Sequence, residues 1–239
     1  MSSLAPEIEE EAGRLGDPAR AAQLRRYFRE PVETYGLTAA QIRELSDRYY
    51  PRVKGDLEAT ISLAGTLLAS GNLTLASVGL SILDRFRRRL EPRHMDIFDG
   101  WVDHLSNWAT TDHLATHMIA AAVAGDHSQV DRLMEWTRSP SRWRRRAAAV
   151  SLVPLARRGL LVEEALSLSD TLMEDEDDMV QKGVGWLLKE ASRTHPVEVR
   201  AHLQRWRTRA PALVLRIASE KLPKDQRVLK HRAQRFASC

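Results

Sequence analysis

The chain has little cysteine and no long hydrophobic run. Its one cysteine, Cys239, is the last of 239 residues, which excludes an internal disulfide framework and a thiolate metal cage. The longest apolar stretches, such as Met118–Ala124, are far shorter than the ~20 residues that span a bilayer. The first residues run into acidic positions instead of a basic and then apolar segment, which argues against a signal peptide. We therefore expect a cytoplasmic protein, because scarce cysteine fits a reducing compartment.

The composition is otherwise that of a globular protein. Hydrophobic residues make up 43% of the chain and charged residues 28%, which is enough to bury a substantial core. The formal net charge of +4 is too small to diagnose nucleic-acid binding, which depends on how charge is gathered on one surface. Aromatic residues are only 6% of the chain, yet six of them are tryptophans, so each tryptophan is a candidate for a role outside the core.

Helical patterns fill nearly the whole chain, and no segment shows sustained strand-like alternation. Asp17 and Pro18 provide an N-cap and a first-turn proline. Thr38 is a second N-cap, Pro51 ends the helix that Thr38 begins, and Gly71 stops the third helix. The predicted helices cover residues 17–29, 38–50, 56–70, 75–90, 93–105, 112–124, 129–137, 142–158, 163–173, 178–193, 197–207, 212–221 and 225–236.

These helices fall into pairs at intervals of roughly 35 to 45 residues, which is the spacing of HEAT-type repeats. No repeat consensus is visible in the sequence itself. We predict one all-α domain over residues 1–239, an α-solenoid of HEAT-like helical repeats that form a curved slab with a concave face. A compact helical bundle is the structural alternative. We expect the tail from about residue 224 to be poorly ordered.

Basic residues are gathered in five clusters on separate predicted elements. Taken singly, each cluster is best interpreted as a solvated face whose side chains pair with nearby carboxylates. Taken together, the clusters would line one groove and hold phosphates, because affinity for DNA rises with each counterion released. The acidic block Glu174–Asp178 precedes a predicted helix and is interpreted as its exposed start, where the helix dipole favours negative charge. The clusters lie at residues 85–89, 142–146, 157–158, 205–209 and 221–235.

Several common site motifs are absent. His113 and His117 would share one face of a helix, but the residues between them lack the glutamate of a zinc-protease helix. No third ligand is apparent, so we expect no metal site. Gly183-Val184-Gly185 lies in a helical pattern with no preceding strand, so close helix packing is its expected purpose and not dinucleotide binding. With no P-loop and no nucleophile elbow, we expect no cofactor.

Four features, in order along the chain, resemble the AlkD family of DNA alkylation-repair enzymes. The resemblance extends over nearly the whole sequence without large gaps. Its features are Tyr27 in an early Arg-Tyr-Phe run, Trp108 and Asp112 separated by three residues, Arg146 before two alanines, and the segment Gln181–Glu190 with Trp186, followed by a turn at 193–196.

Two positions depart from the family pattern. Ala109 stands where the family usually has an aspartate, and Lys189 stands where it usually has an arginine. The missing aspartate is expected to remove a structural hydrogen bond and not the reacting carboxylate. Lysine keeps the positive charge but lacks the bidentate fork of arginine. Both changes bear on efficiency and substrate range more than on the type of reaction.

The resemblance implies a monofunctional DNA glycosylase that removes cationic N3- and N7-alkylated purines from duplex DNA without flipping the base. It further implies a monomer whose concave face binds the duplex. Asp112 would stabilise the developing sugar cation, while Trp108 and Trp186 would flank the damaged nucleotide. The implied DNA-binding residues are Arg146, which would hold a phosphate, with Tyr27, Arg144, Arg145, Lys182 and Lys189.

Two other functions compete with this reading. A non-catalytic relative would bind damaged or branched DNA through the same groove, and a protein-binding scaffold would share only the helical repeats. Asp112 together with Trp108 and Trp186 favours the glycosylase, because a binding protein does not need that carboxylate. The sequence leaves open whether bulky adducts are accepted. It also leaves open whether the role is general repair or resistance to one alkylating natural product.

Overall fold

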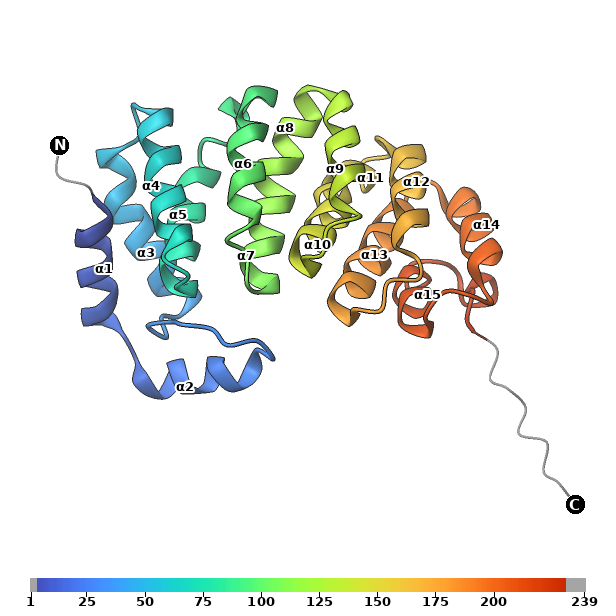
Figure 1. Cartoon of the computed structure of the whole chain (residues 1–239), viewed down its shortest axis with the longest axis horizontal. Helices are drawn as coiled ribbons and strands as arrows, with labels where there is room; N and C mark the ends of the chain where they lie inside the picture. Colours follow the sequence, from blue (N-terminus) through green and yellow to red (C-terminus); the bar gives the residue numbers. More distant parts are fainter. Residues whose placement is uncertain (1–3, 231–239) are drawn as a thin grey trace, which may run out of the picture. The chain divides into compact units, whose positions relative to one another are not determined.

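The computed structural model describes residues 4–230, and within that range every regular element is a helix except one isolated bridge between Glu33 and Asn72 (Figure 1). The prediction of an all-α fold is confirmed. Contacts divide the chain into two compact units, residues 1–129 and 130–239. The single domain and the solenoid arrangement stay predictions. None of the described helices is both long and apolar enough to cross a membrane.

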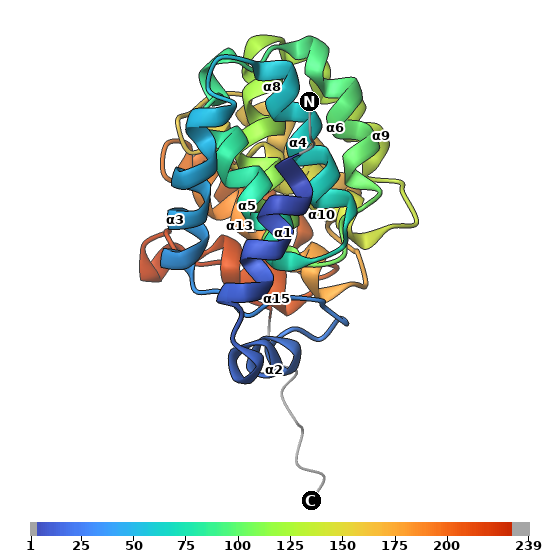
Figure 2. The same cartoon turned by 90° about the vertical axis from the view of Figure 1, so that its left-hand side faces the viewer.

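In the first unit α4 and α5 pack along each other, and α3 lies against α5. Helix α2 lies crosswise at one end of α1, which is visible when Figure 1 is compared with the turned view in Figure 2. The helices are α1 Leu4–Leu15, α2 Pro18–Tyr27, α3 Ala39–Tyr49, α4 Leu57–Ala69, α5 Leu73–Asp84, α6 Met95–Val102, α7 Trp108–His113, a π-helical segment Leu114–Ile119 and α8 Ala120–Gly125, with 3-10 turns at Tyr50–Arg52, Arg87–Arg89, Pro92–His94 and His127–Gln129.

The predicted starts of α2 and α3 are confirmed by their caps. The Asp17 carboxylate accepts hydrogen bonds from two backbone N–H groups of the first turn of α2, at 2.9 and 3.0 Å. Thr38 and Gln41 form a capping box, in which each side chain satisfies the backbone of the other residue. These contacts depend on residues within one turn, which is why the sequence reveals them.

Helix α1 is absent from the sequence-based prediction. Its inner face includes Ile8, which is completely buried in the core cluster of the first unit. Its outer face carries glutamates that pair with α3 and the turn after it. Glu7 binds Arg52 with 2.5 Å between Oε2 and Nη1, and Glu11 binds Arg48. The acid-rich composition hides the narrow apolar stripe of α1 in the sequence.

The second unit is arranged around α13, which contacts α10, α11, α12, α14 and α15. Gly183 lies against the side chain of Arg146, and Gly185 lies against Ile217. The close packing expected for this Gly-Val-Gly segment is therefore confirmed. The helices are α9 Val130–Trp136, α10 Arg142–Ser151, α11 Val153–Ala156, α12 Val162–Leu172, α13 Asp178–Ala191, α14 Pro196–Trp206 and α15 Ala212–Ala218, with a 3-10 turn at Lys224–Gln226.

Several predicted helices have other bounds in the structure, as three examples show. The predicted helix over 142–158 divides at Leu152 into α10 and α11, because Pro154 has no N–H for an unbroken helix. The predicted helix over 75–90 ends at Asp84 and is followed by a 3-10 turn. The helix expected from residue 112 begins at Trp108, since the Asn107 side chain caps α7.

The expectation of a poorly ordered tail from about residue 224 stays a prediction, and residues 224–230 pack on the second unit. The backbone of Val228 exchanges two hydrogen bonds with the Ser219 hydroxyl, each 3.1 Å long, and its side chain is buried. The helix predicted over 225–236 is wrong as far as residue 230, because only the turn Lys224–Gln226 is helical there. Residues 231–236 of that prediction lie outside the described part of the chain.

Candidate functional site

Helix α7 positions Trp108 and Asp112 in the first unit. The buried Asn107 fixes its start, because the Asn107 side chain accepts a hydrogen bond from the Thr110 N–H at 3.0 Å. The Asn107 carbonyl in turn accepts from the Thr111 hydroxyl at 2.7 Å. Trp108 and Asp112 stand four residues apart on this anchored turn, so both project from one face of α7. The π-helical segment follows directly, and such segments are frequent at functional sites.

Trp108 is held by two aromatic side chains from the end of α2. The Phe28 ring stacks on it with centroids 5.6 Å apart and planes at 25°, and the Tyr27 ring meets it edge-on at 6.3 Å. Phe28 is buried, Trp108 is partly exposed, and Tyr27 is 67% exposed. The structure therefore brings Tyr27 beside Trp108. Phe28 was missed as a site residue, although its place next to Tyr27 in an aromatic pair was a usable signal.

A cavity of about 550 Å³ opens beside Asp112 within the first unit. Its walls combine polar and apolar groups and carry charges of both signs. They come from α3, from α5 and from α7 with the π-helical segment after it. Helix α5 packs against both of the others. The lining residues are Ala39, Ile42, Arg43, Ser46, Ser81, Asp84, Arg85, Asp112, His113, Thr116 and His117.

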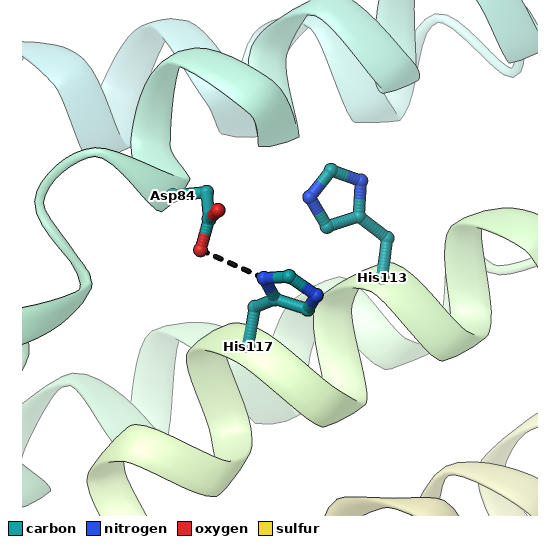
Figure 3. Close-up of side chains that lie close together, drawn as sticks. All are labelled: Asp84, His113 and His117. Carbon is teal, nitrogen blue, oxygen red and sulfur yellow. Dashed lines mark hydrogen bonds and ion pairs between the residues drawn. The ribbon is translucent and has the colours of Figure 1, made fainter.

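Three of these residues form a compact group, shown in Figure 3. The His117 Nδ1–H donates a hydrogen bond of 2.8 Å to Asp84 Oδ1, and the His113 ring lies edge-on to His117 with centroids 4.9 Å apart. Burial, followed by repulsion from His117, lowers the pKa of His113 to about 4, so its ring is neutral at pH 7. Burial raises the pKa of the Asp84 carboxyl. The hydrogen bond from His117, together with the charges of His117 and Arg87, outweighs burial, so the pKa lies below its usual value.

In the second unit, α13 carries Trp186 between two lysines. Lys182, Trp186 and Lys189 are spaced by four and three residues, so they share one face of the helix. Trp186 is partly exposed. The Lys182 ammonium is 3.0 Å from an Asp178 oxygen, and the Lys189 ammonium is 3.3 Å from a Glu220 oxygen. Both lysines therefore present a positive charge next to the tryptophan, each already beside one carboxylate.

The arginines of α10 are bound largely by their own protein. Arg146 is buried and donates to the Met179 carbonyl at the start of α13. Arg145 forms a two-point ion pair with Asp175, with distances of 2.6 and 3.2 Å. The Arg144 guanidinium lies 5.3 Å from the centre of the Trp136 ring. In this cluster the arginines interact mainly with groups of the protein itself. They do not form a row of unoccupied guanidinium groups that could bind phosphates.

The acidic block before α13 supplies much of that pairing. Asp177 caps α13, accepting from the Met179 N–H at 2.8 Å, so the predicted helix-start role is confirmed. The expectation that the block is simply exposed is wrong, because the Asp175 side chain is only 8% exposed. Glu174 also binds Arg209 from the next basic cluster. The acidic block thus pairs with Arg145 and Arg209, which belong to the basic clusters that were expected to line a phosphate-binding groove.

Comparisons with known proteins match the chain over most of its length. A family model described as "DNA alkylation repair enzyme" matches residues 8–222. A solved structure described as a predicted DNA alkylation repair enzyme from Enterococcus faecalis is 18% identical, with a TM-score of 0.73, and covers 87% of this chain and 97% of its own. The structure of smu.31 from Streptococcus mutans is also 18% identical, with a TM-score of 0.52, and covers 92% of this chain and 96% of its own. At this identity the two structures show a shared fold. No curated protein matches.

Proposed function

Because the chain belongs to the DNA alkylation repair enzyme family, we propose that it is a monofunctional DNA glycosylase acting on cationic N3- and N7-alkylated purines in duplex DNA. The observation that carries the proposal is the pairing of Asp112 with Trp108 on one anchored helical turn, against an aromatic surface that Tyr27 extends to solvent. A carboxylate beside a partly exposed aromatic face suits a reaction in which positive charge moves from a base to a sugar.

The chemistry follows from the charge of the lesion. A purine alkylated at N3 or N7 is cationic, so the bond from its ring nitrogen to C1′ breaks with both electrons leaving on the base, which departs neutral. The positive charge then lies on the deoxyribose. Water adds to C1′ and loses a proton, for which the Asp112 carboxylate is the proposed acceptor.

The carboxylate also stabilises the sugar cation. At about 4 Å and an effective dielectric constant near 20, one charge pair is worth on the order of 4 kcal/mol. That corresponds to roughly a thousandfold in rate, an upper bound because Asp112 must lose hydration when DNA binds. An indole face attracts a cation by about 0.5 to 2 kcal/mol, so Trp108 and Trp186 are proposed to favour charged lesions.

DNA binding is proposed to involve both units, because a duplex is a long ligand. Tyr27 and Trp108 contribute from the first unit, and Trp186 with Lys182 and Lys189 contributes from the second. Arg144 is the other residue proposed to contact DNA, and Arg145 and Arg146 are proposed to contribute to DNA binding indirectly. Arg145 and Arg146 act mainly by supporting α13, since their donors already contact Asp175 and the Met179 carbonyl. We propose that the damaged base stays in the duplex, that the enzyme acts as a monomer and that it needs no cofactor.

The test is the Asp112→Asn variant on duplex containing 7-methylguanine. We expect base release in a single turnover to fall at least tenfold, while duplex affinity changes by no more than a few fold, because the carboxylate acts on the transition state and contributes little to ground-state binding. Asp131→Asn, an exposed aspartate in α9, serves as the matched control and should retain wild-type rates.

Equal activity of the Asp112→Asn variant and the wild type would remove Asp112 from the mechanism. A wild type that binds the duplex but releases no base would instead support the non-catalytic DNA-binding relative. Free 7-methylguanine and abasic sites should be measured together, since a glycosylase produces them in equal amounts.

A further inference from the structure

The group formed by Asp84, His113 and His117 has the composition of a metal site. It offers two imidazoles and one carboxylate, whose potential ligand atoms all lie within 4.8 Å of one another (Figure 3). From the sequence no metal is expected, because no third ligand is apparent there. That premise is wrong, since α5 ends at Asp84 and brings its carboxylate against the two histidines.

The spacing of the group suits a first-row cation. With bonds of about 2.0 to 2.1 Å, two ligands of a tetrahedral zinc ion lie about 3.4 Å apart. Asp84 Oδ1 and His117 Nδ1 are 2.8 Å apart, and the widest separation in the group is below 4.8 Å. The separations in the group therefore lie within about 1.4 Å of those around a bound zinc ion.

Buried residues hold the backbone that carries the two histidines. His113 closes α7, and His117 lies one turn later in the π-helical segment, between the fully buried Leu114 and Met118. The competing contact to Asp84 is weak, because Arg87 Nη1 is 3.8 Å away and the Arg87 side chain is half exposed. Arg85, which also lines the cavity, is paired with Asp47.

We propose that Asp84, His113 and His117 bind one divalent transition-metal ion, with zinc as the expected occupant. Imidazole nitrogen and carboxylate oxygen are ligands that zinc accepts, and three protein ligands leave one position free. That position faces the cavity that Asp112 also lines, so water completes the coordination shell. The inference stands apart from the proposed glycosylase activity, because metal binding is measured without DNA.

The experiment titrates Zn²⁺ into the full chain, freed of any histidine tag, by isothermal calorimetry, with Co²⁺ absorption as a spectroscopic probe of nitrogen ligation. We expect one ion per chain. His113→Ala and Asp84→Asn should each weaken binding at least about tenfold, since even residues that only orient a ligand commonly have effects of that size. His104→Ala and His127→Ala are the controls, because both histidines are exposed in the same unit and lie outside the group.

A second measurement needs no variant. Zn²⁺ should protect His113 and His117 of the wild type from acylation by diethyl pyrocarbonate and leave His104 and His127 reactive, as read by peptide mass spectrometry. Absence of stoichiometric Zn²⁺ binding would overturn the proposal. Binding that is unchanged in both His113→Ala and Asp84→Asn, or protection that is equal at all four histidines, would overturn it as well.

Discussion

The guanidinium of Arg145 is surrounded by acceptors of its own protein. Its Nε and Nη2 bind Asp175, and its Nη1 donates to the carbonyls of Ser139 and Pro140 at 2.9 and 3.1 Å. Arg145 is 19% exposed and Asp175 is 8% exposed, so water screens the pair only slightly. At this residue, positive charge serves to join α10 to the segment before α13.

Replacing Arg145 by alanine should therefore lower the free energy of unfolding by about 3 kcal/mol, because it leaves the largely shielded Asp175 carboxylate without its cationic partner. Urea denaturation followed by circular dichroism measures this change. Arg158→Ala, at an exposed arginine beyond α11, should change stability by no more than about 0.5 kcal/mol.

The same variant separates the structural role of Arg145 from DNA binding. A residue whose donors are already occupied makes no new phosphate contact, so the salt dependence of duplex binding should keep its slope in Arg145→Ala. A slope reduced by about one unit with unchanged stability would show that Arg145 is a phosphate ligand after all.

Helix α13 packs closely against its neighbours at two glycines, and at Gly185 an added side chain would force a neighbour to shift. A Cβ atom at Gly185 would lie 2.8 Å from the Cβ of Ile217 in α15. At Gly183 it would lie 3.3 Å from the Arg146 side chain of α10. Because Trp186 and Lys182 are neighbours of these glycines, the packing also fixes the direction in which the proposed DNA-binding face points.

Gly185→Ala should destabilise the protein by about 1 to 2 kcal/mol, since the overpacking penalty exceeds the gain in helix propensity. Gly100→Ala is the matched control in α6, where the added methyl group meets nothing within 4 Å. There only the propensity acts, and we expect stability to rise by up to about 1 kcal/mol. Thermal melts of both variants measure these changes in stability. A stabilised Gly185→Ala variant would contradict the close packing of Gly185 against Ile217.

At the scale of the whole molecule, the two units carry different parts of the proposed chemistry. The first unit has the carboxylate of Asp112 and the aromatic surface of Tyr27 and Trp108, and the second has Trp186 between two lysines. The proposed residues include no general acid for a leaving base. His113 does not fill that role, because its lowered pKa keeps it neutral at pH 7.

The charge of the lesion should therefore decide whether it is removed. We expect release of 7-methylguanine and 3-methyladenine, whose leaving groups are already activated, and negligible release of uracil, hypoxanthine and 1,N6-ethenoadenine. Single-turnover assays on matched duplexes measure the rates side by side. Comparable rates for uracil and 7-methylguanine would mean that an acid and a base-reading pocket act in this protein.

The sequence by itself determined the features that depend on neighbouring residues. The caps at Asp17, Thr38 and Asp177 satisfy backbone groups within one turn, so their residue types are sufficient to predict them. The same holds for the one-turn spacing of Trp108 and Asp112, and for the order of motifs along the chain that indicated the family.

Only the tertiary structure decided which residues meet across helices. Phe28 on Trp108, Asp84 on His117 and Asp175 on Arg145 are each pairs from distant parts of the chain. No local pattern encodes such contacts, because they depend on how the helices pack, which the buried side chains of many segments set together. For the same reason a third ligand for the two histidines, invisible in the sequence, appears once α5 lies against the π-helical segment.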